Sequence, residues 1–319
     1  MRRPRRPRSA PLATTSASSP ARSGSRSPRR TAGSVSSRPI AGYEASIADM
    51  ERMGRQRSTR MAVRFNNLSR LLYTAGQPRR AHEAAQRGLA IARDVAKDNE
   101  LSALLEANDS RALIELGWFD EAKALSEHAL ASATERKDAR WTGTFALYGA
   151  PAWCASGDLA RCASLLALAR DKLGATLPAS HPNLGALALA EAQLAMAQSQ
   201  PDQARRQLQQ AIAIFQAATE RSPLQVRALG LLARVEQRLG DAAGASAHSL
   251  QAVAQARELA QDFTGSDWLA DALLARAAVQ QAQGDGAAAQ ATLRAAQGQL
   301  QAALGDAAPA ARAVLPPAV

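Results

Sequence analysis

A pattern of small residues recurs six times along this chain, and it restricts the possible fold more than any other feature of the sequence. Each unit carries a marker residue, five times a glycine and once a serine, and the markers follow one another at intervals of 40 to 44 residues. The markers are Gly76, Gly117, Gly157, Ser199, Gly240 and Gly284. A period of this length indicates a stack of similar supersecondary units, each packed on its neighbours.

Three columns of small residues accompany the markers. Seven positions before each marker stand Ser69, Ser110, Ala150, Ala192, Ala233 and Ala277. Five positions after it stand Ala81, Ala122, Cys162, Ala204, Ala245 and Ala289. Twelve positions after it stand Gly88, Ala129, Ala169, Ala211, Ala252 and Ala296. Agreement of three columns over six units is much stronger than the abundance of alanine would produce by chance.

Helical hairpins explain these columns. A glycine at a helix end permits a left-handed backbone conformation, so we expect each marker to end one helix and begin a tight turn. Asp158, Asp241 and Asp285 directly follow their markers and are expected to cap the second helix. Small residues before and after the turn allow the two helix axes to approach closely, and the third column faces the first helix of the next unit.

Composition favours helix over strand, because alanine and leucine dominate and only 4% of the residues are aromatic. We expect first helices near 60–75, 101–116, 138–155, 182–198, 222–239 and 266–283. Second helices are expected near 78–96, 119–136, 158–172, 201–219, 242–262 and 286–303. Pro151 is expected to kink or shorten the third of the first helices. Residues 43–57 predict one further helix, either a cap or half of an eroded unit.

The clearest hairpin segments read LGWFDEAKALSEHAL (116–130) and LGDAAGASAHSLQAV (239–253). They resemble the tetratricopeptide repeat (TPR), which places small residues at the same points around a helix–turn–helix. The resemblance covers roughly residues 60–304, with a period near 41 where the usual repeat has 34. Such long repeats are similar to those of kinesin light chain and of TPR tails of bacterial serine/threonine kinases, notably in ASHPNLGALALAEAQLA and LQAALGDAAPAARAV.

The resemblance implies an all-α solenoid of about six hairpins that forms a right-handed superhelix. Its concave groove would be lined by the first helices. Proteins of this kind bind other proteins or peptides and do not catalyse reactions. We therefore expect residues 42–304 to form the repeat domain and residues 305–319, with three prolines, to form a loose tail.

The basic charge of the chain is concentrated at its beginning. Residues 1–43 contain ten arginines and no lysine or acidic residue, which leaves 29 basic and 28 acidic residues for the rest. Residues 1–41 are rich in Arg, Ser and Pro and are expected to be a disordered arm. The arm either attracts nucleic acid, a membrane or another acidic partner, or is a solvated tail or sequence upstream of the true start. No apolar run follows its arginines, which argues against a secretory signal.

Motifs for chemistry are weak throughout. RDVAKDN (93–99) and DFTG (262–265) resemble kinase fragments, but they lie too far apart and lack a glycine-rich loop. The four histidines, His82, His128, His181 and His248, do not have metal-ligand spacing. Cys154 and Cys162 are expected to be reduced thiols, with Cys162 packed in a small-residue column. We expect no enzyme activity, no cofactor and no metal.

Two columns of the first helices suggest a binding site. Asn67 and Asn108 each stand nine residues before their markers, and Arg70 and Arg111 each stand six before. In TPR proteins these columns often contribute to the concave face. An asparagine can pair with a peptide backbone, and an arginine can bind a carboxylate. The later units replace the asparagine with Tyr148, Ala190, Leu231 and Ala275, so the alternative is that these residues are solvated or capping residues.

We therefore predict a cytoplasmic scaffold or regulatory protein of bacterial signalling that binds a protein or peptide. The alternative is a nucleic-acid-associated protein in which the arm supplies affinity and the repeats recruit a partner. No membrane insertion is expected, because the longest uncharged stretches, 141–157 and 173–190, contain proline and glycine and are too polar to span a bilayer.

Overall fold

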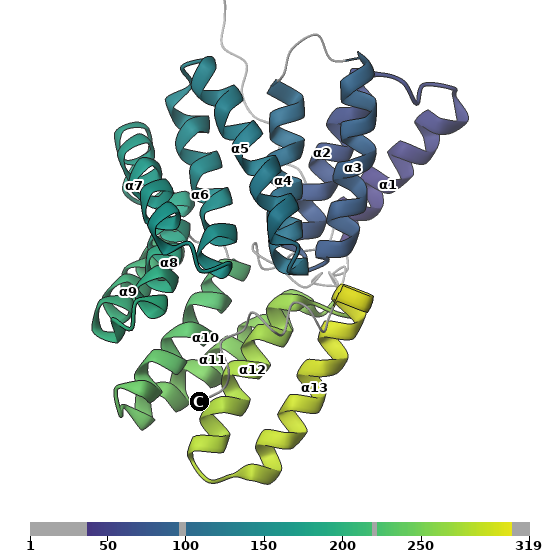
Figure 1. Ribbon diagram of the computed structural model, residues 1–319. Helices are drawn as coiled ribbons and strands as arrows, with labels where there is room; N and C mark the ends of the chain where they lie inside the picture. The colour runs from purple at the N-terminus through teal and green to yellow at the C-terminus, as the bar shows by residue number, and fades with distance from the viewer. Residues whose placement is uncertain (1–36, 96–99, 219–221, 308–319) are drawn as a thin grey trace, which may run out of the picture. The chain divides into compact units, whose positions relative to one another are not determined.

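The computed structural model describes residues 37–95, 100–218 and 222–307, and all regular structure within these ranges is helical. One helix, α1 (Ser37–Arg52), precedes a series of helical hairpins that follow one another along the chain (Figure 1). The first three hairpins are α2 (Thr59–Thr74) with α3 (Pro78–Val95), α4 (Glu100–Leu116) with α5 (Phe119–Glu135), and α6 (Ala139–Ala155) with α7 (Leu159–Thr176). The last three are α8 (Pro182–Ala197) with α9 (Pro201–Ala217), α10 (Pro223–Arg238) with α11 (Ala242–Ala260), and α12 (Asp267–Ala282) with α13 (Gly286–Leu304). The expected all-α solenoid of hairpins is confirmed.

The turns lie where the marker residues predict them. Gly76, Gly117, Gly157, Gly240 and Gly284 all have positive φ, between 72° and 87°. Ser199, the one marker without glycine's freedom, takes the same left-handed conformation with φ 58°. The hairpin geometry therefore imposes this backbone conformation even where the side chain disfavours it.

The capping and packing roles of the flanking residues are also confirmed. The side chains of Asp158, Asp241 and Asp285 each accept a hydrogen bond from the backbone N–H three residues further on. All eighteen residues of the three small columns are buried, and most alanines among them have no exposed surface. At Gly88 a Cβ would lie 2.6 Å from Leu105 on α4, which shows that this column faces the next hairpin.

The even-numbered helices form an inner layer. They pack on one another in order, α2 on α4, α4 on α6, α6 on α8, α8 on α10 and α10 on α12. The odd-numbered helices from α3 to α11 each pack mainly between the two even-numbered helices that precede and follow them in the chain. Side chains on the inner layer can therefore meet across several hairpins, which is what a binding groove requires.

The expectation that Pro151 shortens its helix is not met: α6 continues through it to Ala155, the end that the repeat predicts, and the adjacent Ala150 and Ala152 are buried. Helix α1 begins at Ser37, inside the range expected for the arm, and ends at Arg52 instead of residue 57. Its end is set by Gly54, which has φ 68°, while the next amide, that of Arg55, donates to the Met50 carbonyl. Residues 1–36 and 308–319, to which most of the expected disorder was assigned, lie outside the described residues.

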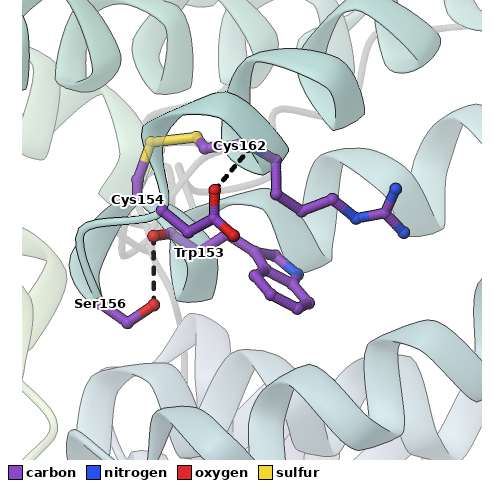
Figure 2. The surroundings of a disulfide bond; sticks show 6 residues. Trp153, Cys154, Ser156 and Cys162 are labelled. Atoms are coloured by element: carbon purple, nitrogen blue, oxygen red, sulfur yellow. Dashed lines mark hydrogen bonds between the residues drawn. A yellow bond between two sulfur atoms is a disulfide. The ribbon is translucent and has the colours of Figure 1, made fainter.

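The third hairpin carries a covalent link across its turn. Cys154 near the end of α6 and Cys162 in α7 form a disulfide, with their Cα atoms 5.2 Å apart (Figure 2). Cys162 is buried as expected, but the prediction of reduced thiols is wrong. The reason is geometric: the position five residues after the turn lies at the closest approach of the two helices, and Cys154 stands opposite it, three residues before the turn.

In the described ranges, none of the helices combines the length and the apolar character that crossing a bilayer would need.

Candidate functional site

The four residues predicted for the groove lie on two adjacent inner helices, α2 and α4. Asn67 and Arg70 belong to α2, where Asn67 is partly exposed and Arg70 is exposed. Asn108 and Arg111 belong to α4, where both side chains are largely covered. The repeat therefore brings the two columns onto neighbouring helices, but it leaves the α2 members more open than the α4 members.

The asparagine column does not form a pair of free amides. The side-chain amide of Asn108 donates a hydrogen bond to the side-chain oxygen of Asn66, at 2.9 Å, and only 8% of Asn108 is exposed. Asn66 is the neighbour of the predicted Asn67. One amide of the column thus holds α4 against α2, and Asn67 retains the accessible amide.

Arg111 lies between two tyrosine rings. Its guanidinium carbon is 3.9 Å from the ring centroid of Tyr73 on α2 and 4.2 Å from that of Tyr148 on α6. Tyr148 occupies the asparagine column of the third hairpin, so the residue that departs from the expected pattern supplies one face of this sandwich. Planar guanidinium groups stack well on aromatic faces, and the two rings fix the orientation of the Arg111 side chain.

A second guanidinium, that of Arg227, lies on the inner layer between α4, α10 and α12. Arg227 on α10 donates to both carboxylate oxygens of Glu115 on α4, at 2.7 and 2.8 Å. It also donates to Asp271 on α12, at 3.0 and 2.8 Å, and lies 4.3 Å from the ring centroid of Trp268. The Tyr73 hydroxyl donates to Glu115 at 3.3 Å, which links this cluster to the Arg111 sandwich.

The side chains of this cluster are largely buried, and burial shifts the pKa values of two of them. Burial raises the pKa of the Tyr73 phenol well above its usual range. Burial also raises the pKa of Asp271, although the nearby Arg227 lowers it again in part. Buried charges of this kind are tolerated only when they are paired and hydrogen-bonded, which is the role that Arg227 has for Glu115 and Asp271.

Sequence reasoning missed Tyr73, Glu115, Arg227, Trp268 and Asp271. One signal was present: Arg227 and Asp271 each stand thirteen residues before their markers, Gly240 and Gly284, so the repeat predicts opposite charges side by side on α10 and α12. Nothing in the spacing predicts the contact of Arg227 with Glu115. That contact joins hairpins that are not neighbours in the chain.

The remaining candidates have structural roles. Residues 262–265 lie in the loop after α11, where Asp262 accepts a hydrogen bond from the Ser37 amide, and residues 96–99 lie outside the described residues. His82, His128 and His248 each pair with a buried carboxylate, those of Asp109, Glu106 and Glu236, at 2.5 to 2.7 Å. His181 caps α8 by accepting from the Asn183 amide.

Comparison with known proteins gives structural relatives alone. No protein-family model matches the sequence, and no curated protein matches it. Among solved structures, a Rap protein complexed with Competence and Sporulation Factor aligns with a TM-score of 0.61 at 12% identity, over 86% of this chain and 84% of that one.

Two further structures are similar. A tetratricopeptide repeat protein from Parabacteroides merdae has a TM-score of 0.51 at 12% identity, over 87% of this chain and 98% of that one. BtubC (BKLC) from P. vanneervenii has a TM-score of 0.51 at 18% identity, over 71% of this chain and 92% of that one. At these identities the comparisons show the fold, and the fold is that of the tetratricopeptide-repeat proteins.

Proposed function

We propose that this chain, with its tetratricopeptide-repeat fold, is a non-catalytic scaffold that binds a peptide or protein segment on its inner layer. The observation that carries the proposal is the Arg111 sandwich. Two tyrosine rings hold a guanidinium in one orientation on the inner layer, and Arg70 occupies the equivalent position on the adjacent helix. A preorganised arginine costs less entropy to bind a ligand than a freely rotating one.

The chemistry of these groups favours a ligand with a carboxylate. A guanidinium binds a carboxylate through two parallel hydrogen bonds, and Arg70 is exposed and free of ion pairs with other described residues. The partly exposed amide of Asn67 can donate to and accept from a peptide backbone on the same helix. An acidic side chain or a C-terminal carboxylate on an extended segment would match this arrangement.

A regulatory role in bacterial signalling is the more specific form of the proposal. It is supported by the likeness to a Rap protein whose structure contains a bound factor. The expected cytoplasmic location remains a prediction. The disulfide argues against it, because such bonds are rare in reducing compartments such as the cytoplasm.

A captured partner provides the test. We would isolate the partner from the native host with the full chain, map its bound segment, and measure that segment's affinity by titration calorimetry. Arg70→Ala removes one charge-assisted interaction of about 1.5–3 kcal/mol and should weaken binding about tenfold or more. Arg206→Ala, an exposed arginine of the outer helix α9, is the matched control and should bind normally.

Two results would contradict the proposal. Unchanged affinity of Arg70→Ala would remove this residue from the site. Unchanged affinity of a segment whose carboxylates are amidated would show that the arginines do not bind a carboxylate. The alternative role in nucleic-acid binding depends on residues 1–41, which lie almost entirely outside the described residues, and no observation on the repeats favours it.

A further inference from the structure

The last hairpin contacts the first where α13 packs on α3 and through a set of residues that we call the seam, 73–77 on one side and 265–268 on the other. The Gln77 side chain donates to the Gly265 carbonyl, and the Asp267 amide donates to the Gly76 carbonyl at 3.2 Å. The rings of Tyr73 and Trp268 meet edge to face, with centroids 5.6 Å apart. Trp268 also belongs to the hydrophobic cluster of α1 and α2, so the seam is packed as well as hydrogen-bonded.

Gly76 is unlike the turn glycines Gly157, Gly240 and Gly284. A Cβ at Gly76 would lie 2.7 Å from a carboxylate oxygen of Asp267 and 2.9 Å from the Trp268 ring. At Gly240 and Gly284, which have the same positive φ, a Cβ would meet nothing within 4 Å. The first turn therefore needs glycine for two reasons, its backbone conformation and the close approach of α12.

The seam encloses a carboxyl group with no hydrogen-bond partner. Asp267 is only 4% exposed, and neither of its carboxylate oxygens has a partner among the described residues. The nearest cation, Arg227, already donates to Glu115 and Asp271. Arg227 thus bonds two of the three carboxyl groups in this region, and the third, that of Asp267, lies in the seam without a counter-charge of its own.

A buried carboxylate without a partner is unfavourable, and the neutral acid is the form that fits this place. Burial raises the pKa of Asp267 far above its ordinary value, and the charges of Glu115 and Asp271 raise it further. Attraction to Arg227 and the adjacent Trp268 amide lower it only in part. The other ionisable group facing Asp267 is Tyr73 from α2, whose own pKa is raised by burial.

We propose that the seam is a proton-linked latch, closed while Asp267 carries a proton and opened when Asp267 ionises. Opening separates the first hairpin from the last and exposes Trp268 and the inner side of Arg227. The latch would regulate access to the inner layer, which goes beyond the proposed function. Its test requires no partner, so it can fail or succeed independently of the proposed function.

The direction of the effect follows from proton binding. The closed state binds the Asp267 proton more tightly than the open state, in which the carboxyl group is solvated and has an ordinary pKa near 3.9. The seam is therefore most stable at low pH. It loses stability as the pH rises from the ordinary pKa of the open state toward the raised pKa of Asp267 in the closed state. One proton changes the opening equilibrium by at most tenfold per pH unit.

Hydrogen–deuterium exchange on the full chain tests this directly. The reporter is the amide at 267, which donates to the Gly76 carbonyl of the first hairpin in the closed state. The amide at 266 donates to Gln299 within the last hairpin and is the internal control. Exchange is measured from about pH 5 to about pH 9 and corrected for the intrinsic effect of pH, and circular dichroism follows the fold at each point. Protection of the amide at 267 should fall with rising pH in the unmodified chain, by up to about tenfold per unit, while the amide at 266 and the far hairpin α8–α9 keep their protection.

Two pairs of variants separate the latch from general instability. Asp267→Asn imitates the protonated acid and should keep the seam protected at every pH within about twofold, whereas Asp171→Asn, exposed on α7, should behave as the unmodified chain. Gly76→Ala should lose seam protection at every pH, whereas Gly240→Ala strains an equivalent turn and should not.

Seam protection that does not change with pH in the unmodified chain would overturn the latch. So would an Asp267→Asn variant that retains the pH dependence, or equal seam protection in Gly76→Ala and Gly240→Ala.

Discussion

The guanidinium of Arg227 on α10 makes two hydrogen bonds with the carboxylate of Glu115 on α4, although the two residues are 112 positions apart. The same guanidinium donates to Asp271 on α12. One side chain therefore joins three inner helices. Helices α10 and α12 belong to successive hairpins, whereas α4 belongs to the second hairpin and is a neighbour of neither. This contact joins α4, α10 and α12 in one polar network and motivates the first prediction.

Replacing Arg227 should destabilise the chain by leaving two acidic side chains without their partner. Arg227→Met removes hydrogen bonds to charged groups and should lower the free energy of unfolding by about 1.5–3 kcal/mol. Combining it with Glu115→Gln should cost less than the sum of the two single changes, because the pair is coupled. Chemical denaturation of the four chains measures this, and strict additivity would contradict it.

Overpacking the small columns should destabilise the hairpins. Ala122→Leu and Ala245→Leu replace residues that are at most 1% exposed, and each should cost about 1–3 kcal/mol. Ala131→Leu, on the exposed face of α5, is the control and should stay within about 0.5 kcal/mol. Thermal melts of the three variants give the comparison, and equal losses in all of them would refute the assignment of the columns.

The two predicted groove arginines should differ in their effect on stability. Arg111→Ala removes a guanidinium that stacks on Tyr73 and Tyr148 and should cost about 0.5–2 kcal/mol. Arg70→Ala, on an exposed side chain, should change stability by no more than about 0.5 kcal/mol. Denaturation curves should show this order, and a larger effect at Arg70 would mean that its contacts have been misassigned.

The pair of His82 and Asp109 should make stability depend on pH. The hydrogen bond to Asp109 raises the pKa of His82, so its stabilisation is complete below the unfolded value of about 6.5 and is lost as the pH rises through the raised value. The stability difference between the unmodified chain and His82→Gln should therefore shrink between about pH 6 and pH 8, by at most about 1.4 kcal/mol per unit.

His181 is a natural control for this measurement. Burial, followed by the charge of Arg140, lowers the pKa of His181, and its ring must be neutral to accept from the Asn183 amide. Its stabilisation is present above the unfolded pKa and is lost as the pH falls. His181→Asn, which keeps a capping oxygen, should thus show the opposite trend, and the same trend in both variants would contradict the assignment.

The disulfide should stabilise the third hairpin. Closing a loop as short as that between Cys154 and Cys162 is worth about 2–3 kcal/mol through the entropy of the unfolded chain. Reduction, or the double change Cys154→Ala and Cys162→Ala, should lower the melting temperature, while alanine at 162 keeps the small column intact. Alkylation and mass spectrometry of the protein from its native host would show whether the bond forms there, and free thiols would contradict it.

The local elements of this fold were predictable from the sequence. Gly76, Gly117 and the other markers set the turns because few residues other than glycine adopt positive φ easily, and the small columns set where helices touch because only small side chains permit that approach. Both effects act over one hairpin and its neighbour. For the same reason the columns located Asn67, Arg70, Asn108 and Arg111 on adjacent helices, although not the tyrosines around Arg111 or the bond from Asn108 to Asn66.

Contacts between distant hairpins were decided only by the tertiary structure. Whether Glu115 meets Arg227, or Gly76 meets Asp267, depends on the small rotation between successive hairpins, added up over the whole array. A change of a few degrees per hairpin is invisible in the residue pattern but moves the last hairpin by many ångströms. The sequence alone thus determined the hairpins and their stacking, and the curvature of the stack decided which charged side chains share a buried site.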